Sequence, residues 1–318
     1  MDYNEVLETA RTKIGTKCKA CPICNGVACR NTMPGPGAKG IGDTAIRNYQ
    51  KWQEIRVNMD TICEKKQIDT GLELFGKHFS YPFFAGPVGA IAMHYSNAYS
   101  DVTYNEVLVS ACAENGIAAF TGDGLDSSVM AAATQAIKAV DGQGIPTVKP
   151  WNLETIKEKL ALVKESGAFA VAMDIDAAGL PFLQNMMPPA GSKSVSELAE
   201  IAQQAGAHAI IVSNHGGRVL DQCAATAEVL PEIAAAVDGK MRIIVDGGIR
   251  SGVDIFKALA LGADAVIIAR PFVTAVFGGG QEGVKVYIEK LAAELKDTMA
   301  MCGAFTLKEI TSEMVRRS

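Results

Sequence analysis

The chain of 318 residues is 48% hydrophobic and contains 31 glycines, which suits one large domain or two average ones of α/β type. Its formal net charge of −5 at pH 7 argues against a nucleic-acid or membrane-surface partner. No apolar run approaches the length that crosses a bilayer, and the acidic, polar residues Met1–Glu8 do not resemble a signal peptide, so we expect a cytoplasmic protein with reduced cysteines.

Two regions of the chain differ in pattern. Residues 1–80 predict a cysteine-rich, helical segment that packs on the remainder. In residues 81–318, short apolar strands alternate with amphipathic helices, and the amphipathic run Val284–Met301 predicts a helix packed on the elements before it. Residues 177–194 predict a long, mobile loop of the kind that forms lids or binding loops.

Seven strands are expected in the second region, at Pro82–Gly86, Ile117–Thr121, Pro146–Lys149, Phe169–Asp176, Ala209–Ser213, Ile243–Asp246 and Ala265–Ala269. Helical patterns lie between them, at Tyr104–Asn115, Ser127–Val140, Leu153–Ser166, Ser194–Ala205, Ala224–Val237 and Gly252–Leu261. Apolar strands separated by helices are typical of a parallel sheet covered by helices. The expected fold class is therefore α/β, a (β/α)8 barrel, although a barrel needs eight strands and seven are recognisable.

The most informative string is Ser-Asn-His-Gly-Gly-Arg-Val-Leu-Asp at residues 213–221, directly after a predicted strand. His215 can take up a proton near neutral pH, and Arg218 can bind a carboxylate through its planar guanidinium group. The glycines between them remove side chains where a flat ligand approaches the backbone. Strand ends also carry ordinary polar loop residues, but the whole string favours a reaction site.

A second candidate site combines Asp246-Gly247-Gly248 with Arg250, and with Arg270 after the next strand. Glycine backbone N–H groups near a helix start, together with two arginines, form a binding site for an anion such as phosphate.

The third signal is a group of four cysteines, Cys18, Cys21, Cys24 and Cys29, within twelve residues. Four thiolates at this spacing can bind one tetrahedral metal ion or a small cluster. The spacing partly resembles ferredoxin-type runs and is unusual for a zinc ribbon, which has two separated pairs. An iron–sulfur cluster, zinc, and thiols without metal all stay open. The isolated cysteines Cys63, Cys112, Cys223 and Cys302 are expected to be small buried hydrophobic residues.

Ser213–Asp221, Asp246–Gly252 and Phe256–Ala263 together resemble the FMN-dependent α-hydroxy acid oxidases and dehydrogenases, which include glycolate oxidase and lactate oxidase, over about residues 45–305. The resemblance implies that His215 removes the substrate proton while a hydride equivalent passes to flavin N5. It implies that Asp176 stabilises the cationic histidine and that Arg218 binds the substrate carboxylate. The FMN-binding residues that it implies are Gly86, Pro87, Val88, Thr121, Lys149, Asp174, Ser213, Asp246, Gly247, Gly248, Arg250, Ala269 and Arg270.

The chain departs from the family pattern at several positions. Lys149-Pro150-Trp151 stands where the family has Gln-x-Tyr, and Asp174 stands where it has threonine. Lys149 and Asp174 end neighbouring predicted strands, so they could pair beneath the flavin or form an ordinary ion pair. Residues 177–192 lack the family's second carboxylate-binding arginine, and the N-terminal substrate tyrosine is unmatched. Carboxylate recognition would then rest on Arg218 alone, so glycolate and lactate cannot be named as substrates.

One βα unit is missing at Gly206/Ala207 by comparison with the family, and with it the lysine that lies by flavin N1. Such a unit has roughly 30 residues, since about 250 residues are shared among eight units. Either the barrel is open at this point, or Leu180–Leu183 fills the gap. Lys149 is the lysine of the strand ends that could replace the missing one.

We therefore expect an FMN-dependent oxidoreductase that acts on a 2-hydroxy acid-like small molecule. It is expected to be a dehydrogenase with an unidentified acceptor other than oxygen, and a homo-oligomer, a tetramer or larger. Two alternatives stay open: an FMN- or metal-binding barrel without turnover, and a flavin-dependent isomerase-type activity.

Overall fold

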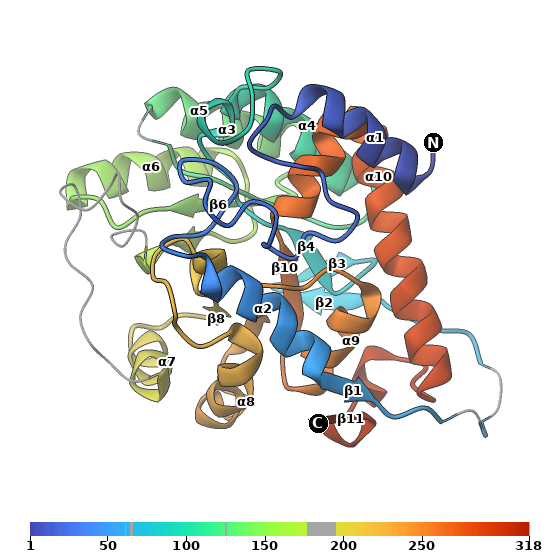
Figure 1. Cartoon of the computed structure of the whole chain (residues 1–318). Helices are drawn as coiled ribbons and strands as arrows, with labels where there is room; N and C mark the ends of the chain where they lie inside the picture. The colour runs from blue at the N-terminus through green and yellow to red at the C-terminus, as the bar shows by residue number, and fades with distance from the viewer. Residues whose placement is uncertain (61, 64–65, 125, 177–194, 318) are drawn as a thin grey trace.

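The computed structural model describes residues 1–60, 62–63, 66–124, 126–176 and 195–317. Seven parallel strands form one sheet in the order β7-β6-β5-β4-β10-β9-β8. The first strand of the series thus pairs with the last, as the strands of a barrel do (Figure 1). These strands are β4 (Phe83–Ala85), β5 (Ala119–Thr121), β6 (Gly144–Val148), β7 (Ala172–Met173), β8 (Ala209–Val212), β9 (Arg242–Val245) and β10 (Ala265–Ile268).

The sheet is open between β7 and β8, which stand at the two ends of the strand order. Within the described residues no backbone pairing joins these two strands. A complete barrel has one further strand at this place, which agrees with the βα unit missing at Gly206/Ala207. The expected barrel lacking one βα unit is therefore confirmed. The predicted loop 177–194, with Leu180–Leu183 as the candidate to fill the gap, lies outside the described residues.

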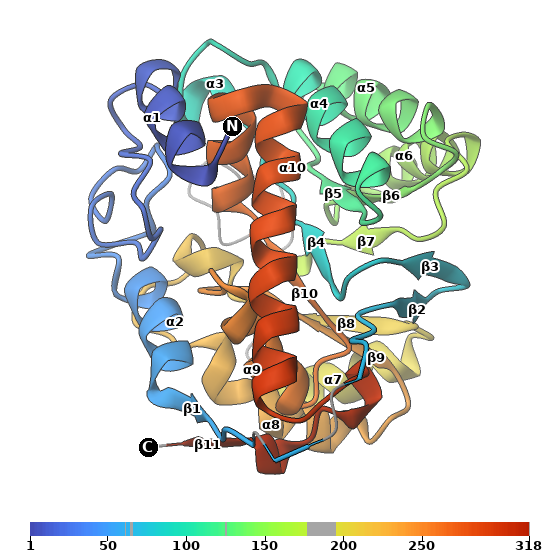
Figure 2. The same cartoon turned by 90° about the vertical axis from the view of Figure 1, so that its right-hand side faces the viewer.

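Helices alternate with these strands and cover the outside of the sheet (Figures 1 and 2). They are α4 (Asp101–Glu114), α5 (Ser127–Lys138), α6 (Leu153–Glu165), α7 (Val195–Gln204), α8 (Thr226–Val237), α9 (Gly252–Ala260) and α10 (Arg270–Met301). Side chains that accept the first free N–H groups fix several helix starts: Ser100 caps α4, Asn152 caps α6 and Ser251 caps α9. The expected strands and helices are all present, with ends that shift by a few residues.

Helix α10 is longer than the sequence pattern indicates. The amphipathic run begins at Val284, whereas the helix begins at Arg270 and is kinked at Gly280, whose φ is 57°. The kink joins the helix that follows β10 to the C-terminal helix, and the side chains of Val284, Leu291 and Leu295 are buried. Since Gly278–Gly280 are poor helix formers, the sequence alone hides this continuity.

The N-terminal residues pack on the barrel in two pieces. Helix α1 (Tyr3–Lys13) runs along α10 (Figure 2), and a Cβ atom at Gly278 would lie 2.2 Å from the carbonyl oxygen of Val6. After the N-terminal loop, residues 14–42, helix α2 (Asp43–Glu54) leads to β1 (Ile55–Val57). The remaining short elements are β2 (Leu72–Leu74), β3 (Lys77–Phe79), α3 (Ile91–His94), η2 (His215–Gly217), η3 (Leu307–Glu309), η4 (Ser312–Met314) and β11 (Val315–Arg317), with β1 pairing β11 and β2 pairing β3 antiparallel.

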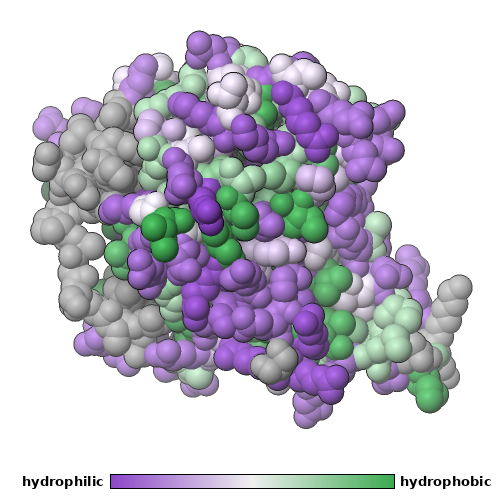
Figure 3. All heavy atoms as spheres, viewed as in Figure 1, coloured by the Kyte–Doolittle hydropathy of each residue, from purple (hydrophilic) through white to green (hydrophobic). Residues whose placement is uncertain are grey.

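The surface around α2 is largely hydrophilic, and hydrophobic residues gather in patches above it (Figure 3). Those patches lie where the N-terminal loop crosses the barrel (Figure 1). None of the described helices is both long enough and apolar enough to span a membrane.

Candidate functional site

His215 contacts two carboxylates at the open edge of the sheet. It follows β8, whereas Asp174 and Asp176 follow β7, so the contact crosses the gap between the two edge strands. The Nδ1 atom of His215 is 2.9 Å from Oδ1 of Asp176 and 3.5 Å from Oδ1 of Asp174. His215 has a φ of 56°, and the two glycines after it are also left-handed. A left-handed histidine is strained, which is a common property of functional residues.

The two carboxylates decide the charge of the histidine. Burial alone would lower the pKa of His215, but its interactions with Asp174 and Asp176 outweigh burial and raise that pKa to about 10. Burial would likewise raise the pKa of Asp174, but the neighbouring imidazolium lowers it to about 2. Burial raises the pKa of Asp176. At neutral pH the group is therefore an imidazolium with at least one carboxylate, and Nε2 is the ring nitrogen that the carboxylates leave available.

The same three side chains have the composition of a cation site, since their ligand atoms lie within 4.8 Å of one another. In the geometry described, Nδ1 of His215 lies at hydrogen-bond distance from Oδ1 of Asp176. With a proton on Nδ1 the arrangement is an ion pair, because a protonated ring nitrogen has no free lone pair for a metal ion.

Arg218 binds the N-terminal loop in this structure. Its Nη1 atom donates to the carbonyl oxygens of Gly35 at 2.8 Å and Gly37 at 2.6 Å. Its Nη2 atom is 3.2 Å from Nε2 of His94, whose Nδ1 accepts the N–H of Gly35 at 3.0 Å. Burial and the charge of Arg218 lower the pKa of His94 to about 4, so this histidine is neutral. Nothing in the local sequence singled out His94, because its partners are distant in the chain.

The two arginines assigned to an anion also contact the N-terminal loop. Arg250 donates from Nε to the carbonyl oxygen of Cys24 at 2.6 Å, and Arg270 donates to the carbonyl oxygens of Pro36 at 3.5 Å and Gly216 at 3.2 Å. A guanidinium group has five N–H donors. Arg250 also donates to the carbonyl oxygen of its neighbour Ile249. Both arginines still have further N–H donors that could bind a phosphate.

The glycines beside them have a structural reason of their own. Gly248 has a φ of 83°, and a Cβ atom there would lie 2.1 Å from the carbonyl oxygen of Asn48 in α2. Gly247 accepts a hydrogen bond from Nε1 of Trp52 at 2.7 Å. These glycines thus allow α2 to approach the strand end closely, whether or not a phosphate also binds there.

Several polar atoms at the strand ends are buried without a partner in the described part of the chain: Oγ1 of Thr121, Oγ1 of Thr147 and Oδ1 of Asp246. Burial raises the pKa of Asp246 to about 6, although a hydrogen bond from Ser213 acts to lower that pKa. The hydroxyl of Ser213 also accepts the N–H of His215 at 3.0 Å. Unpartnered buried atoms are costly. A ligand with several polar atoms at the mouth of the barrel would satisfy them, so these residues fit a polar cofactor such as a flavin nucleotide.

The turn after β4 lies close to β10. A Cβ atom at Gly86 would be 2.7 Å from Cγ2 of Ile267 and 2.9 Å from Cβ of Ala269. The backbone at Gly86 therefore runs directly against the neighbouring strand end, and a side chain at this position would prevent that close approach.

Lys149 does not form the expected ion pair with Asp174. Among the described residues, no ion pair within 4.0 Å joins Nζ of Lys149 to the carboxylate of Asp174. Instead its Nζ donates to the carbonyl oxygen of Asp123. The carboxylate of Asp123 accepts from Nζ of Lys159 at 2.6 Å and from Nε1 of Trp151 at 2.7 Å. No sequence signal distinguished Asp123 from the other strand-end residues, yet it accepts hydrogen bonds from Lys149, Trp151 and Lys159, all of which follow β6.

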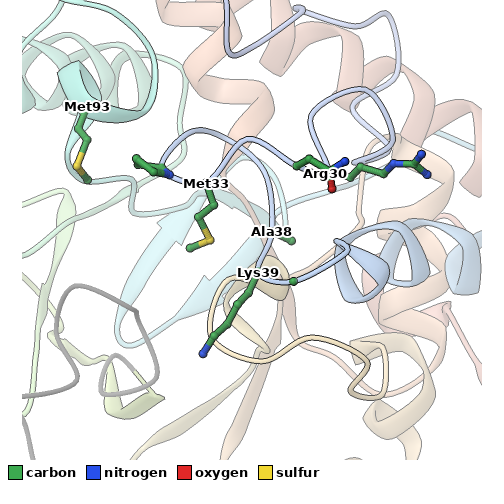
Figure 4. Close-up of a pocket in the computed structure, with 8 residues that line it drawn as sticks. Arg30, Met33, Ala38, Lys39 and Met93 are labelled. Carbon is green, nitrogen blue, oxygen red and sulfur yellow. The ribbon is translucent and has the colours of Figure 1, made fainter.

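A cavity of about 550 Å³ lies between the N-terminal loop and α3. Met33 and Lys39 extend into it from the loop, and Met93 approaches from the segment around α3 (Figure 4). The lining combines the cations Arg30 and Lys39 with apolar methionine side chains, which suits a small molecule with an anionic end and an apolar part.

The four cysteines Cys18, Cys21, Cys24 and Cys29 surround a second, smaller cavity in the same loop. None of the eight cysteines forms a disulfide bond. Cys112 and Cys302 are buried, as expected, but the expectation is wrong for Cys63, which is exposed, and for Cys223, which is half-buried.

Comparison with known proteins places this geometry in a family. A family model described as FMN-dependent dehydrogenase matches residues 36–186 and 194–317. A 2-hydroxyacid oxidase of Dictyostelium discoideum is 48% identical over 117 residues, which are 37% of this chain and 30% of that protein. An L-lactate oxidase of Nostoc sp. is 44% identical over 159 residues, 48% of this chain and 44% of that protein. The matched region is thus less than half the length of either relative.

The fold agrees with solved structures. Mandelate oxidase with 3,3-difluoro-2-hydroxy-3-phenylpropionic acid superposes with a TM-score of 0.78 at 23% identity, covering 99% of this chain and 98% of the other. A variant of flavocytochrome b2 with sulfite bound superposes with a TM-score of 0.73 at 21% identity, covering 86% of this chain and 79% of the other. Since the family model matches most of the sequence, the chain belongs to the FMN-dependent dehydrogenase family.

Proposed function

We propose that the chain binds FMN at the C-terminal ends of its strands and oxidises a 2-hydroxy acid. The observation that carries this proposal is His215, held by Asp174 and Asp176 at the strand ends, where Thr121 and Asp246 have buried oxygens without a partner among the described residues. His215, once neutral, removes the proton of the substrate hydroxyl through Nε2, and Asp176 orients the ring and stabilises its cation. Bound FMN supplies the acceptor for the hydride equivalent.

The residues that would hold FMN fall into two groups. Gly86, Pro87 and Val88 would lie against the ring, and the hydroxyl of Thr121 would bind its polar edge, with Lys149, Asp174 and Ser213 nearby. Asp246, Gly247, Gly248, Arg250, Ala269 and Arg270 would form the phosphate end. Support comes from the unpartnered buried oxygens and from the unused guanidinium donors described above.

The substrate carboxylate is assigned to Arg218. Its guanidinium group already binds the carbonyl oxygens of Gly35 and Gly37. A carboxylate must therefore either use the remaining N–H donors or replace these two carbonyls. Because an ionised acceptor makes the stronger hydrogen bond, a 2-hydroxy acid can compete for the same guanidinium edge.

The test is His215→Ala, with the exposed His78→Ala as the matched control. FMN binding should persist in both variants, while FMN reduction by a panel of 2-hydroxy acids should fall by about 10²–10⁴ in His215→Ala alone, the range for loss of a general base. Unchanged reduction would show that the assigned base is wrong. Tight FMN binding by the unmodified protein without bleaching by any acid would favour the barrel without turnover, and turnover that needs reduced flavin would favour the isomerase.

Other parts of the proposal rest on indirect support. The eight cysteines form no disulfide bond, which is typical of a reducing cytoplasm. Val171, Met173 and Ile175 are exposed along the β7 edge, which supports contact between copies in a tetramer or larger assembly. Residues 1–80 are taken as a segment that covers the barrel of residues 81–318. We also propose a metal centre at the four cysteines, which favours a dehydrogenase with an acceptor other than oxygen.

A further inference from the structure

The cysteines of the N-terminal loop come together although they belong to no regular element. Cys18, Cys21, Cys24 and Cys29 line one largely enclosed cavity, together with other loop residues and with Tyr95, Arg270 and Thr274 from outside the loop. We propose that these four cysteines bind an iron–sulfur cluster, and that the cluster holds the N-terminal loop in place over the active site. This inference rests on the metal centre proposed above but not on the flavin chemistry.

The sequence spacing of the cysteines favours a cluster over zinc. Among the described residues, no three of these Sγ atoms lie within 4.8 Å of one another, since the group that meets this spacing is Asp174, Asp176 and His215. Tetrahedral zinc with Zn–S bonds of about 2.3 Å requires sulfur atoms about 3.8 Å apart. A core of several iron atoms separates its cysteine ligands more widely, and the first three cysteines have the two-residue spacing of ferredoxin-type runs.

The surroundings of the thiols are suited to negative charge. Arg270 lines the cavity, Arg250 donates to the carbonyl oxygen of Cys24, and Arg11 donates to the carbonyl oxygen of Ala20. Cysteine thiolates bound to a metal carry negative charge, and these arginines would balance the charge of the complex.

The backbone between the first two cysteines is left-handed at Ala20. Ala20 has a φ of 40°, a left-handed conformation that costs an alanine roughly 1–2 kcal/mol. In this conformation the N–H of Ala20 reaches the sulfur of Cys18. Hydrogen bonds to the cysteine sulfurs are among the features by which proteins tune iron–sulfur clusters.

The rest of the loop shows what the cluster would hold. A few residues after Cys29, the carbonyl oxygens of Gly35 and Gly37 bind Arg218. The N–H of Lys39 then donates to the carbonyl oxygen of Gly217 at 2.9 Å. One loop thus surrounds the cysteine cavity and fixes the arginine beside His215, so loss of the cluster would release Arg218.

The first experiment measures iron, zinc and acid-labile sulfide in the anaerobically purified full chain, with electron paramagnetic resonance after dithionite reduction. We expect about two to four iron atoms per chain, matched by sulfide, and a signal from the reduced cluster. One zinc per chain without sulfide overturns the proposal, and so does the absence of metal with eight titratable thiols. Because this measurement needs no variant and no substrate, it is independent of the outcome for His215→Ala.

The second experiment compares Cys24→Ser with Cys63→Ser, an exposed cysteine outside the loop. Cys24→Ser should lose most of its iron, and limited proteolysis should cut residues 18–40 at least about tenfold faster, because an unanchored loop opens more often. Cys63→Ser should retain both iron and protection. Equal iron content in the two variants would contradict the cysteine site. Loss of iron without faster cleavage would contradict its role in anchoring the loop.

Discussion

Asp174 is the residue whose removal most directly tests the electrostatics of the site. We predict that Asp174→Asn lowers the pKa of His215. Asparagine keeps the shape of the side chain but removes a negative charge whose Oδ1 lies 3.5 Å from Nδ1 of His215. Asp176, at 2.9 Å, stays in place to orient the ring.

The size of the effect follows from that distance. For two unit charges 3.5 Å apart, Coulomb's law gives about 5 kcal/mol at an effective dielectric constant of about 20 and about 1 kcal/mol in bulk water. One pKa unit is about 1.4 kcal/mol, so the pKa of His215 should fall by about 1 to 3 units. It would move from about 10 to between about 7 and 9, and the neutral fraction at pH 8 would rise from about 1% to about 10% or more.

Two measurements check this prediction. The chain has four histidines, so the ring of His215 can be titrated by NMR and assigned by its absence in His215→Ala. The rate of FMN reduction should reach its plateau at lower pH in Asp174→Asn, because the neutral form is the base. Asp238→Asn, an exposed carboxylate after α8, should change neither. A pKa of His215 within about 0.5 units of the unmodified protein would refute the reasoning, since even bulk-water screening predicts more.

Two further predictions concern stability. Gly248→Ala should lower the free energy of unfolding by about 1–3 kcal/mol, and it should lower the thermal midpoint more than Gly239→Ala does. Both glycines are left-handed, but only at Gly248 would a Cβ atom lie against a backbone oxygen, that of Asn48. Equal midpoints would show that α2 can move away. Asp123→Asn should lower the free energy of unfolding, measured in urea, by about 3–5 kcal/mol, because it leaves the charge of Lys159 buried without its partner at 2.6 Å. A decrease below about 1 kcal/mol would mean that the lysine reaches solvent.

Local pattern was enough to predict the barrel. The strands are continuous apolar runs, such as Ala265–Ile268, that are buried on both faces, and the helices between them begin at capping side chains such as Ser251. Both features are encoded within a few residues. The missing unit could be located for the same reason, since Gly206 leads from one helix directly to β8.

The contacts of the site side chains could not be predicted in this way. The resemblance brought His215 and Asp176 together, but the position of Arg218 depends on carbonyl oxygens more than 180 residues earlier, at Gly35 and Gly37. The same holds for Lys149, which bonds to Asp123 after the preceding strand instead of to Asp174. In each case the partner is a backbone oxygen, which carries no sequence signal.

The gap between β7 and β8 gives the site a mechanical property. Each of these strands has a hydrogen-bonded neighbour on one side only among the described residues, so their amide protons should exchange with solvent faster than those of β4 or β10. Any breathing of the gap separates His215 from Asp174 and Asp176, because the histidine moves with one edge and the carboxylates with the other. The pKa of His215 would then depend on how far the edges of β7 and β8 are separated.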